Sequence, residues 1–250
     1  MEKKIYFVTD LHLGVPTLED SHERELKLIR FLDSIKNDTE ALFLMGDLFD
    51  FWFEYKTVIP RGYTRLLGRL AQFVDDGIPV HLFAGNHDLW TFDYLQKEIG
   101  IQVHREPMIM TLKDKKFLLV HGDGRGPGDR GYKFLKRVFE CKFNQFLFRW
   151  LHPDVGIGLA LKWSHKHRVK KLKKEAEGNY YSVIEETRLY RYAQECVKEN
   201  PEIDYFVFGH QHKPMQYKVD NAVVTVVGNW IRDFTYAIFD GKEIQLTVYN

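Results

Sequence analysis

The chain has 250 residues, of which 44% are hydrophobic and 15% aromatic, and its formal net charge is +1. This length supports one large α/β domain with its own core, and the near-neutral charge excludes a general electrostatic attraction to nucleic acid. Two cysteines far apart in the sequence exclude a disulfide framework and favour a reducing compartment. No apolar run approaches the roughly 20 residues of a membrane-spanning helix, and the apolar start is too short for a signal peptide. We expect a cytoplasmic protein that is soluble or at most attached to a membrane surface.

The first half of the chain alternates between predicted strands and predicted helices. Short β-rich runs at 4–10, 40–47 and 78–88 are separated by amphipathic helical patterns at 22–37 and 63–77. Strands that alternate with helices indicate βαβ units and a mainly parallel sheet. Functional sites in such sheets lie where the strands end and the loops begin.

The second half combines a helical region with further strands. An antiparallel pair is predicted at 107–112 and 115–123. Next, 132–151 has helical periodicity with apolar residues over a broad face, and 159–200 is typical of two more helices. Strands then return at 203–210, 215–219, 222–229, 234–240 and 244–249, the last four short and alternating as in an antiparallel sheet. We expect one domain over residues 1–250, an α/β sandwich with a helical insertion at about 130–185.

Polar residues follow five of the predicted strands at the same relative place. They are Asp10 and His12, Asp47, Asn86 and His87, His121, and His210 and His212. Each has an ordinary structural explanation on its own, since Asp47 could cap a helix and Asn86 could occupy a left-handed turn. Explaining all of them in this way requires five coincidences. We therefore favour their convergence at one edge of the sheet.

The residue types in this set indicate a metal site. Imidazole nitrogens combined with carboxylate and amide oxygens, without cysteine, suit ions such as Mn²⁺, Fe²⁺ or Zn²⁺. Seven candidate ligands are too many for one tetrahedral ion and suit two ions that share a bridging carboxylate. Two ions about 3.5–4 Å apart clamp the attacking and leaving oxygens of a phosphoryl displacement, and water between them is hydroxide near neutral pH.

The motifs that contain these residues resemble those of the calcineurin-like metallophosphoesterases. Asp10-x-His12, Gly46-Asp47, Gly85-Asn86-His87-Asp88, His121 and Gly209-His210-x-His212 occur in that family's order without a gap. The resemblance implies a four-layer αββα sandwich with the helical region as a lid insertion. It also implies hydrolysis of phosphate esters by a hydroxide held between two metal ions, most readily Mn²⁺, with Fe²⁺ and Zn²⁺ as alternatives.

The same resemblance implies a role for each motif residue. One metal ion would be held by Asp10, His12, Asp47 and His212. The second would be held by Asp47, Asn86, His121 and His210, with Asp47 as the bridge. His87 would contact the phosphate and assist the leaving group without binding metal, and Asp88 would orient it, as a carboxylate can orient an imidazole.

Three further segments resemble the UDP-2,3-diacylglucosamine pyrophosphatases of lipid A synthesis. They are "GDLFDFWFEY" after the second strand, "VVGNWIRD" near the end, and "HGDGRGPGDRGY" before the helical region. The resemblance implies cleavage of a nucleotide-linked glycolipid to UMP and 2,3-diacylglucosamine 1-phosphate (lipid X). It also implies a cytoplasmic enzyme that can be peripheral on the cytoplasmic face of the inner membrane. It implies substrate contacts at Asp129, Tyr132, Lys166, Arg168 and Trp230. Those enzymes carry arginine after the motif asparagine, whereas this chain carries His87, as the wider family does.

The helical insertion has more apolar residues than one core-facing stripe requires. They are Phe134, Leu135, Val138, Phe139, Phe143, Phe146, Leu147, Phe148, Trp150 and Leu151. Such a surplus could hold acyl chains or enter a membrane interface, and the basic run 162–174 could bind a diphosphate or anionic headgroups. The alternative is a helical hairpin that buries its own aromatic residues beneath a solvated basic face. His165 and His167 are interpreted as substrate contacts or surface residues rather than metal ligands.

Three functional hypotheses remain open from the sequence. The first is the glycolipid pyrophosphatase, and the second is a dimetal phosphodiesterase or phosphatase that acts on a soluble nucleotide or phosphoprotein. The third is a phosphoesterase fold used only as a binding scaffold. A competent ligand at every predicted metal position disfavours the scaffold. A soluble substrate gives no reason for surplus aromatic residues beside a basic run, which favours the glycolipid.

Overall fold

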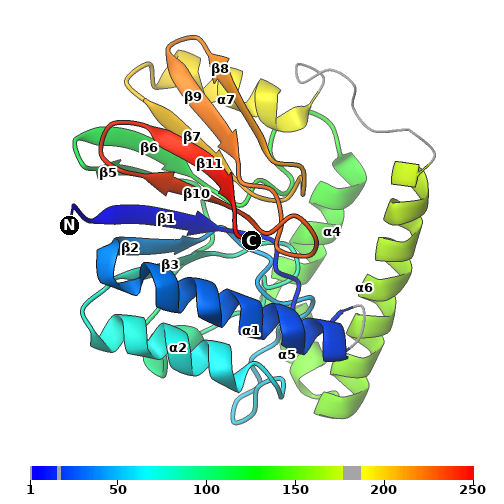
Figure 1. Cartoon of the computed structure of the whole chain (residues 1–250). Coiled ribbons are helices and arrows are strands. Elements are labelled where there is room, and N and C mark those ends of the chain that lie inside the picture. The colour runs from blue at the N-terminus through cyan, green and yellow to red at the C-terminus, as the bar shows by residue number, and fades with distance from the viewer. Residues whose placement is uncertain (1, 16–17, 177–186) are drawn as a thin grey trace.

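The computed structural model describes residues 2–15, 18–176 and 187–250, with only the backbone described at 18–19 and 166–176. Two sheets form its centre (Figure 1). The first sheet has the strand order β11-β10-β1-β2-β3-β4, with β1 to β4 parallel and the β10–β11 hairpin antiparallel beside β1. Its strands are β1 (Lys4–Val8), β2 (Thr39–Leu44), β3 (Val80–Phe83), β4 (Gln102–His104), β10 (Thr235–Phe239) and β11 (Ile244–Val248).

The second sheet has the strand order β5-β6-β7-β9-β8. Its strands are β5 (Met108–Leu112), β6 (Lys115–Leu119), β7 (Tyr205–Phe208), β8 (Met215–Val219) and β9 (Ala222–Val226). Strands β6, β7 and β9 are parallel neighbours, and β5 and β8 join them antiparallel at the two edges. The predicted antiparallel pair at 107–112 and 115–123 is confirmed by the pairing of β5 with β6.

Helices cover the outer face of each sheet, which gives the four layers of an αββα sandwich. Figure 1 shows α1 and α2 along the first sheet and α7 along the second. These helices are α1 (Leu18–Ile35), α2 (Thr64–Asp75) and α7 (Arg188–Glu199). Side chains that alternate along a strand point to opposite faces, so Phe7 packs between the two sheets while Val8 packs towards α1. Val207 likewise lies between the sheets and Phe206 beneath α7.

A helical segment, residues 130–176, lies beside the ends of both sheets (Figure 1). It consists of α4 (Arg130–Glu140), α5 (Lys142–Arg149) and α6 (Pro153–Ala176). The helical periodicity predicted over 132–151 is confirmed, but the segment is divided into two helices because Cys141 is extended (φ −64°, ψ 117°) and separates α4 from α5. Phe139 and Phe148 turn inwards, and both contact the ring of Trp90. The rest of the predicted insertion, 177–186, lies outside the described residues.

The last four strands do not form one antiparallel sheet as predicted. They form two hairpins, β8–β9 in the second sheet and β10–β11 in the first, and β9 also pairs parallel with β7. Alternation in the sequence reveals that a strand has two different faces but not which neighbour it joins. Short elements were also missed, namely β4 and α3 (Tyr94–Lys97).

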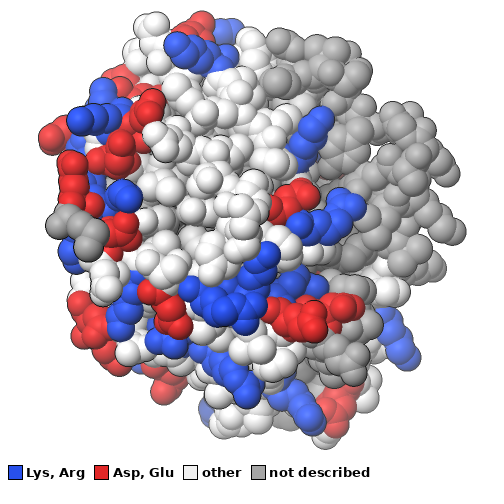
Figure 2. Space-filling view, in the orientation of Figure 1, with Lys and Arg blue, Asp and Glu red and all other residues white. Residues whose placement is uncertain are grey.

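The charged side chains of the surface in Figure 2 are mixed rather than separated by sign. On the face drawn in Figure 2, acidic and basic side chains lie side by side along the left edge and the lower half. The small net charge of +1 therefore does not hide one strongly acidic and one strongly basic patch on this face.

None of the described helices combines the length and apolarity that a bilayer span requires.

Candidate dimetal active site

Five strand ends bring the predicted ligands together at one edge of the sandwich. Loops after β1, β2 and β3 of the first sheet carry Asp10, Asp47 and Asn86, and loops after β6 and β7 of the second carry His121 and His210. Parallel strands end at the same edge, and the two sheets contribute their parallel strands to the same side of the molecule. The site therefore depends on both sheets at once.

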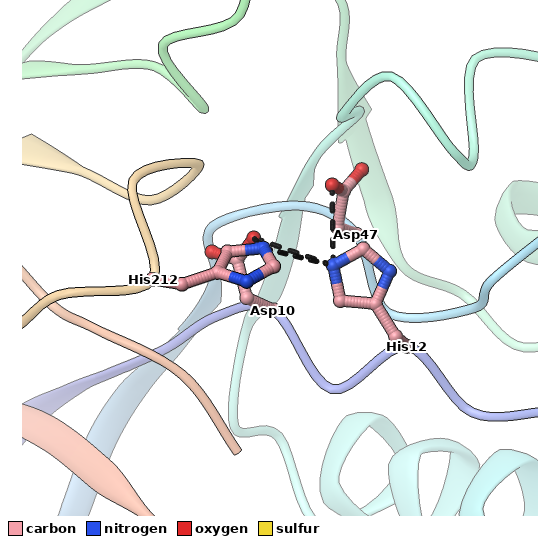
Figure 3. Close-up of side chains that lie close together, drawn as sticks. All are labelled: Asp10, His12, Asp47 and His212. Atoms are coloured by element: carbon pink, nitrogen blue, oxygen red, sulfur yellow. Dashed lines mark hydrogen bonds and ion pairs between the residues drawn. The ribbon is translucent and has the colours of Figure 1, made fainter. Parts of the chain in front are cut away.

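The first cluster consists of four predicted ligands, Asp10, His12, Asp47 and His212, whose ligand atoms all lie within 4.8 Å of one another (Figure 3). The distance from Asp10 Oδ1 to His212 Nε2 is 3.0 Å. His12 Nε2 lies 3.6 Å from Asp10 Oδ1 and 3.5 Å from Asp47 Oδ2. The two Nε2 atoms of His12 and His212 are 3.1 Å apart. Two imidazoles and two carboxylates therefore face one point.

The second cluster shares Asp47 with the first. Asp47, His121 and His210 place ligand atoms within 4.8 Å of one another, and Asp47 Oδ2 is 3.3 Å from His121 Nε2. The Nδ1 of His121 donates to the carbonyl of Met45 at 2.6 Å, which leaves its Nε2 lone pair directed at Asp47. Asn86 Oδ1 is buried and has no hydrogen-bond partner among the described residues.

These atoms fit divalent cations. A buried amide oxygen without a donor is costly in a folded protein unless another partner occupies its lone pairs. Burial raises the pKa of Asp10, but His212 and His12 outweigh burial and hold that pKa well below its usual range. Burial likewise raises the pKa of Asp47, and His121 and His87 lower it well below the usual range. Both carboxylates are thus ionised, as metal ligands must be.

The backbone around the ligands is held in an unusual conformation. Five ligand residues adopt left-handed φ angles: Asp10 (52°), His12 (44°), Asp47 (52°), His210 (67°) and His212 (56°). Such conformations cost about 1–3 kcal/mol each in residues other than glycine and concentrate at functional sites. The surrounding fold therefore holds these side chains in position against their local preference.

Close packing explains the glycines that precede the ligands. A Cβ at Gly85 would lie 2.3 Å from Asp47 Oδ1, and a Cβ at Gly46 would lie 2.4 Å from His121 Nδ1. Both distances are far below van der Waals contact, so each position requires glycine for space, and Gly46 also has a φ of 97°. The glycine of Gly85-Asn86-His87-Asp88 is there because the carboxylate of Asp47 lies against its backbone.

His87 lies beside the carboxylate of Asp47, which the two clusters share, and its imidazole is half-buried. Its backbone N–H donates to Asp47 Oδ1 at 2.9 Å, and its Nδ1 contacts the carbonyl oxygen of Asp50 at 2.7 Å. Burial lowers its pKa from the ordinary value, although the charge of Asp47 acts in the opposite direction. Because a carbonyl oxygen can only accept a hydrogen bond, this contact places a proton on Nδ1, so Nε2 is the acceptor nitrogen of the neutral ring.

The role predicted for Asp88 is corrected by its contacts. Its two carboxylate oxygens accept hydrogen bonds from the backbone N–H groups of Gly85 (2.6 Å) and Leu48 (2.8 Å). Burial, reinforced by the charge of Asp47, raises the pKa of Asp88 to about 7. Asp88 therefore fastens two ligand loops together, and the residue that contacts the His87 imidazole is Asp50.

The structure places the predicted substrate contacts in different surroundings. The prediction for Trp230 is wrong, because its side chain is fully buried and packs against Phe31 and Tyr249. Its backbone N–H donates to the Asp10 carbonyl. Asp129 forms an ion pair with Arg188 at the start of α4. The side chains of Lys166, Arg168 and His167 lie outside the described residues, and that of His165 is exposed.

Tyr132, the remaining predicted contact, turns towards a residue that the sequence analysis missed. Its hydroxyl donates to Asp123 Oδ2 at 2.6 Å, and Lys136 Nζ lies 2.8 Å from the same oxygen. Asp123 and Asp50 are both buried carboxylates beside the ligand set. Each stands within three residues of a predicted ligand, Asp123 after His121 and Asp50 after Asp47, which was the only signal available in the sequence.

Comparison with known proteins identifies the family. The model of the calcineurin-like phosphoesterases matches residues 3–214. The chain belongs to the calcineurin-like phosphoesterase family. This phosphoesterase is thus a hydrolase, and the family agrees with its αββα fold and its clusters of histidine and aspartate.

Several curated relatives share one name, UDP-2,3-diacylglucosamine hydrolase. The relative from Porphyromonas gingivalis (strain ATCC BAA-308 / W83) is 38% identical over 98% of this phosphoesterase and 97% of the relative. The relative from Haemophilus influenzae (strain ATCC 51907 / DSM 11121 / KW20 / Rd) is 28% identical over 93% and 92% of the two chains. Among solved structures, an archaeal phosphodiesterase is 15% identical with a TM-score of 0.47, covering 98% of this chain and 99% of that one.

Proposed function

We propose that this phosphoesterase hydrolyses the pyrophosphate bond of UDP-2,3-diacylglucosamine to UMP and 2,3-diacylglucosamine 1-phosphate. The observation that carries the proposal is the 38% identity to the Porphyromonas gingivalis UDP-2,3-diacylglucosamine hydrolase over 98% of this chain. That coverage includes the helical segment 130–176 as well as the phosphoesterase core. A likeness confined to the core would support ester hydrolysis in general but no particular substrate.

We infer that the two clusters hold two divalent ions, with Mn²⁺ as the first choice. The first ion is assigned to Asp10, His12, Asp47 and His212, and the second to Asp47, Asn86, His121 and His210. When bound, such ions lower the pKa of water and neutralise charge on the phosphate oxygens. His87 is assigned to the phosphate, because its backbone N–H donates to the carboxylate of Asp47 while its side chain remains 23% exposed.

The helical segment supplies a surface suited to acyl chains at a membrane interface. Seven lysine and arginine residues but only two acidic residues lie between 130 and 165, which favours anionic headgroups. Large apolar side chains on this segment are exposed: Phe134, Phe143, Phe146, Leu147, Trp150, Leu151, Val155, Leu159 and Trp163. Inward packing of Phe139 and Phe148 leaves this set uncovered, so burial within the hairpin does not account for it. We therefore propose peripheral binding to a lipid surface through the segment.

Substrate contacts are proposed where the helical segment meets the dimetal centre. Asp129 and Tyr132 flank the start of α4, a few residues after the ligand His121. Lys166 and Arg168 belong to α6, and their basic side chains suit the diphosphate. The acyl chains would then lie along the exposed apolar surface while the diphosphate reaches the metal ligands.

The test compares two substrates with and without metal. UDP-2,3-diacylglucosamine in detergent micelles and bis-p-nitrophenyl phosphate are each incubated with the metal-free protein, before and after addition of Mn²⁺. We expect Mn²⁺-dependent release of UMP that is much faster than turnover of the generic diester. Fast diester cleavage without UMP release would overturn the glycolipid assignment and favour a soluble phosphodiester. Binding to vesicles that contain anionic lipid, measured by co-sedimentation, tests the membrane surface separately.

A further inference from the structure

Asp50 occupies a position between the metal ligands and the helical segment. It lies in the loop after β2, three residues beyond the bridging Asp47, and its side chain is buried. Its carboxylate contacts two histidines on one side and a serine of α6 on the other. Its Oδ2 accepts a hydrogen bond from the serine hydroxyl, and its Oδ1 lies 3.4 Å from His12 Nδ1 and 3.7 Å from His87 Nδ1.

On the metal side, Asp50 faces the outer nitrogen of a ligand. His12 directs Nε2 towards Asp10 and Asp47, while its Nδ1 lies 3.4 Å from Asp50 Oδ1. Histidines that bind metal through one nitrogen commonly donate the other N–H to a carboxylate, which fixes the tautomer and the ring orientation. The imidazole of His87 packs edge-on against that of His12, with ring centroids 4.6 Å apart. Asp50 also contacts His87 Nδ1 through its carbonyl oxygen.

On the other side, Asp50 is bonded to the helical segment. Ser164 Oγ donates to Asp50 Oδ2 at 2.7 Å. Ser164 is buried, although its neighbours Trp163 and His165 on α6 are exposed. The Ser164 side chain therefore points inwards to Asp50, whereas the residues on either side of it face solvent.

We propose that Asp50 is a positioning residue that orients His12 and His87 and couples them to α6 through Ser164. Metal binding and the docking of α6 then stabilise each other, because both depend on the same carboxylate. The proposal rests on the dimetal centre of the proposed function but not on the identity of the substrate. The loop after β2 then has two roles: Asp47 binds metal, and Asp50 orients the two histidines and holds α6 against them.

The first measurement is the affinity for Mn²⁺, followed by the electron paramagnetic resonance of free ion in dialysed samples. Asp50→Asn keeps the shape of the side chain but removes its charge, and we expect about 10–100-fold weaker binding. Asp50→Glu retains a carboxylate and is expected to recover part of the loss. Circular dichroism of the metal-free variants confirms that each is folded. Unchanged Mn²⁺ affinity in Asp50→Asn would overturn the proposal.

The second measurement follows α6 by limited proteolysis with and without Mn²⁺. In the unaltered protein we expect Mn²⁺ to slow cleavage within 153–176, and we expect Ser164→Ala to abolish that protection. Ser34→Ala is the matched control, because Ser34 also donates from a helix, but to the Phe31 carbonyl in α1. Protection that persists in Ser164→Ala would overturn the coupling.

Metal stoichiometry distinguishes orientation from direct binding. Asp50, His12 and His87 are themselves close enough to surround an ion, with ligand atoms within 4.8 Å of one another. Two Mn²⁺ per chain, both bound more weakly in Asp50→Asn, support a positioning role. A third Mn²⁺ that Asp50→Asn removes selectively would overturn it. Loss of UMP release with all these results intact would count against the proposed substrate alone.

Discussion

The ligand side chains at the strand ends and the apolar side chains of the helical segment differ in their relation to solvent. Asp10 and His121 are at most 1% exposed, whereas Trp150 is 76% and Phe134 67% exposed. Burial at the junction of the two sheets holds the predicted ligands in place. The proposed function gives the exposed side chains of the helices a different use, because a surface that binds lipid has to be accessible.

The two regions also differ in how they are held. The strand-end centre is fixed by backbone, through left-handed ligand residues and glycines that leave no space for a side chain. The helical segment is attached by a few side chains, among them Phe148 on Trp90, Ser164 on Asp50 and Lys136 on Asp123. Substitutions should therefore separate the chemistry of the centre from the substrate handling of the segment.

The largest effect is expected from removing a ligand. Asn86→Ala or His121→Ala removes a side chain that we assign to the second ion, so metal occupancy and turnover of both substrates should fall together. We expect a loss of more than about 100-fold in turnover, beyond the range for outer partners of a metal ligand. Metal content by mass spectrometry and kcat for each substrate provide the check. Full occupancy with normal kcat would remove that residue from the ligand set.

A smaller loss, confined to rate, is expected from His87. His87→Ala should lower kcat by about 10²–10⁴-fold, the range of an acid–base or phosphate-contacting group, on both substrates. Metal content should stay at the level of the unaltered protein, because His87 is assigned to the phosphate. His87→Gln keeps a hydrogen-bonding side chain and serves as the comparison. Loss of metal in His87→Ala would show instead that His87 is a ligand.

The third prediction concerns the exposed aromatic surface of α5. The combined change Phe143→Ser, Phe146→Ser and Trp150→Ser should weaken vesicle binding by at least about 10-fold, since burying one such side chain contributes about 1.5–3 kcal/mol. UMP release should fall while cleavage of bis-p-nitrophenyl phosphate is unchanged. Val58→Ser, an exposed apolar residue outside the segment, is the control. Equal loss on both substrates would contradict the separation of the two regions.

The smallest effect is expected where α4 is attached. Burial raises the pKa of Asp123, but His121 and Lys136 outweigh it and hold that pKa below the ordinary value. The ionised carboxylate therefore adds stability above its unfolded pKa of about 4, and that stability is lost as the pH falls through the folded pKa. Lys136→Met should reduce the free energy of unfolding at pH 7 by about 2 kcal/mol.

The pH dependence identifies the cause of that change. Because Lys136→Met weakens the preference for ionised Asp123, the difference from the unaltered protein should shrink as the pH falls below about 4. Denaturant unfolding at pH 7 and in mild acid measures it. Lys142→Met, on the exposed start of α5, is the control and should change little. A difference that is constant with pH would assign the effect to packing instead.

Much of the centre could be predicted because its residues are tied to strand ends. Each buried strand is a short apolar run, and the polar residue after it stands out in the sequence, which applies to Asp10, Asp47, Asn86, His121 and His210. Buried residues that lie beside the ligands without following a strand directly, such as Asp50 and Asp123, were not predicted. Trp230 lies just beyond a strand end as the predicted ligands do, yet only its packing on Phe31 shows that it belongs to the core.

The sequence by itself determined the layered α/β class, the succession of most strands and helices along the chain, and which polar residues follow the strands. These features depend on burial and periodicity, which are local properties of the chain. The tertiary structure decided how strands were shared between the sheets, and it gave the contact with His87 to Asp50 rather than Asp88. Asp50 and Asp88 are both acidic residues in ligand loops, and the sequence does not distinguish them. Their partners, Ser164 on one side and the Gly85 and Leu48 amides on the other, meet only when distant segments pack.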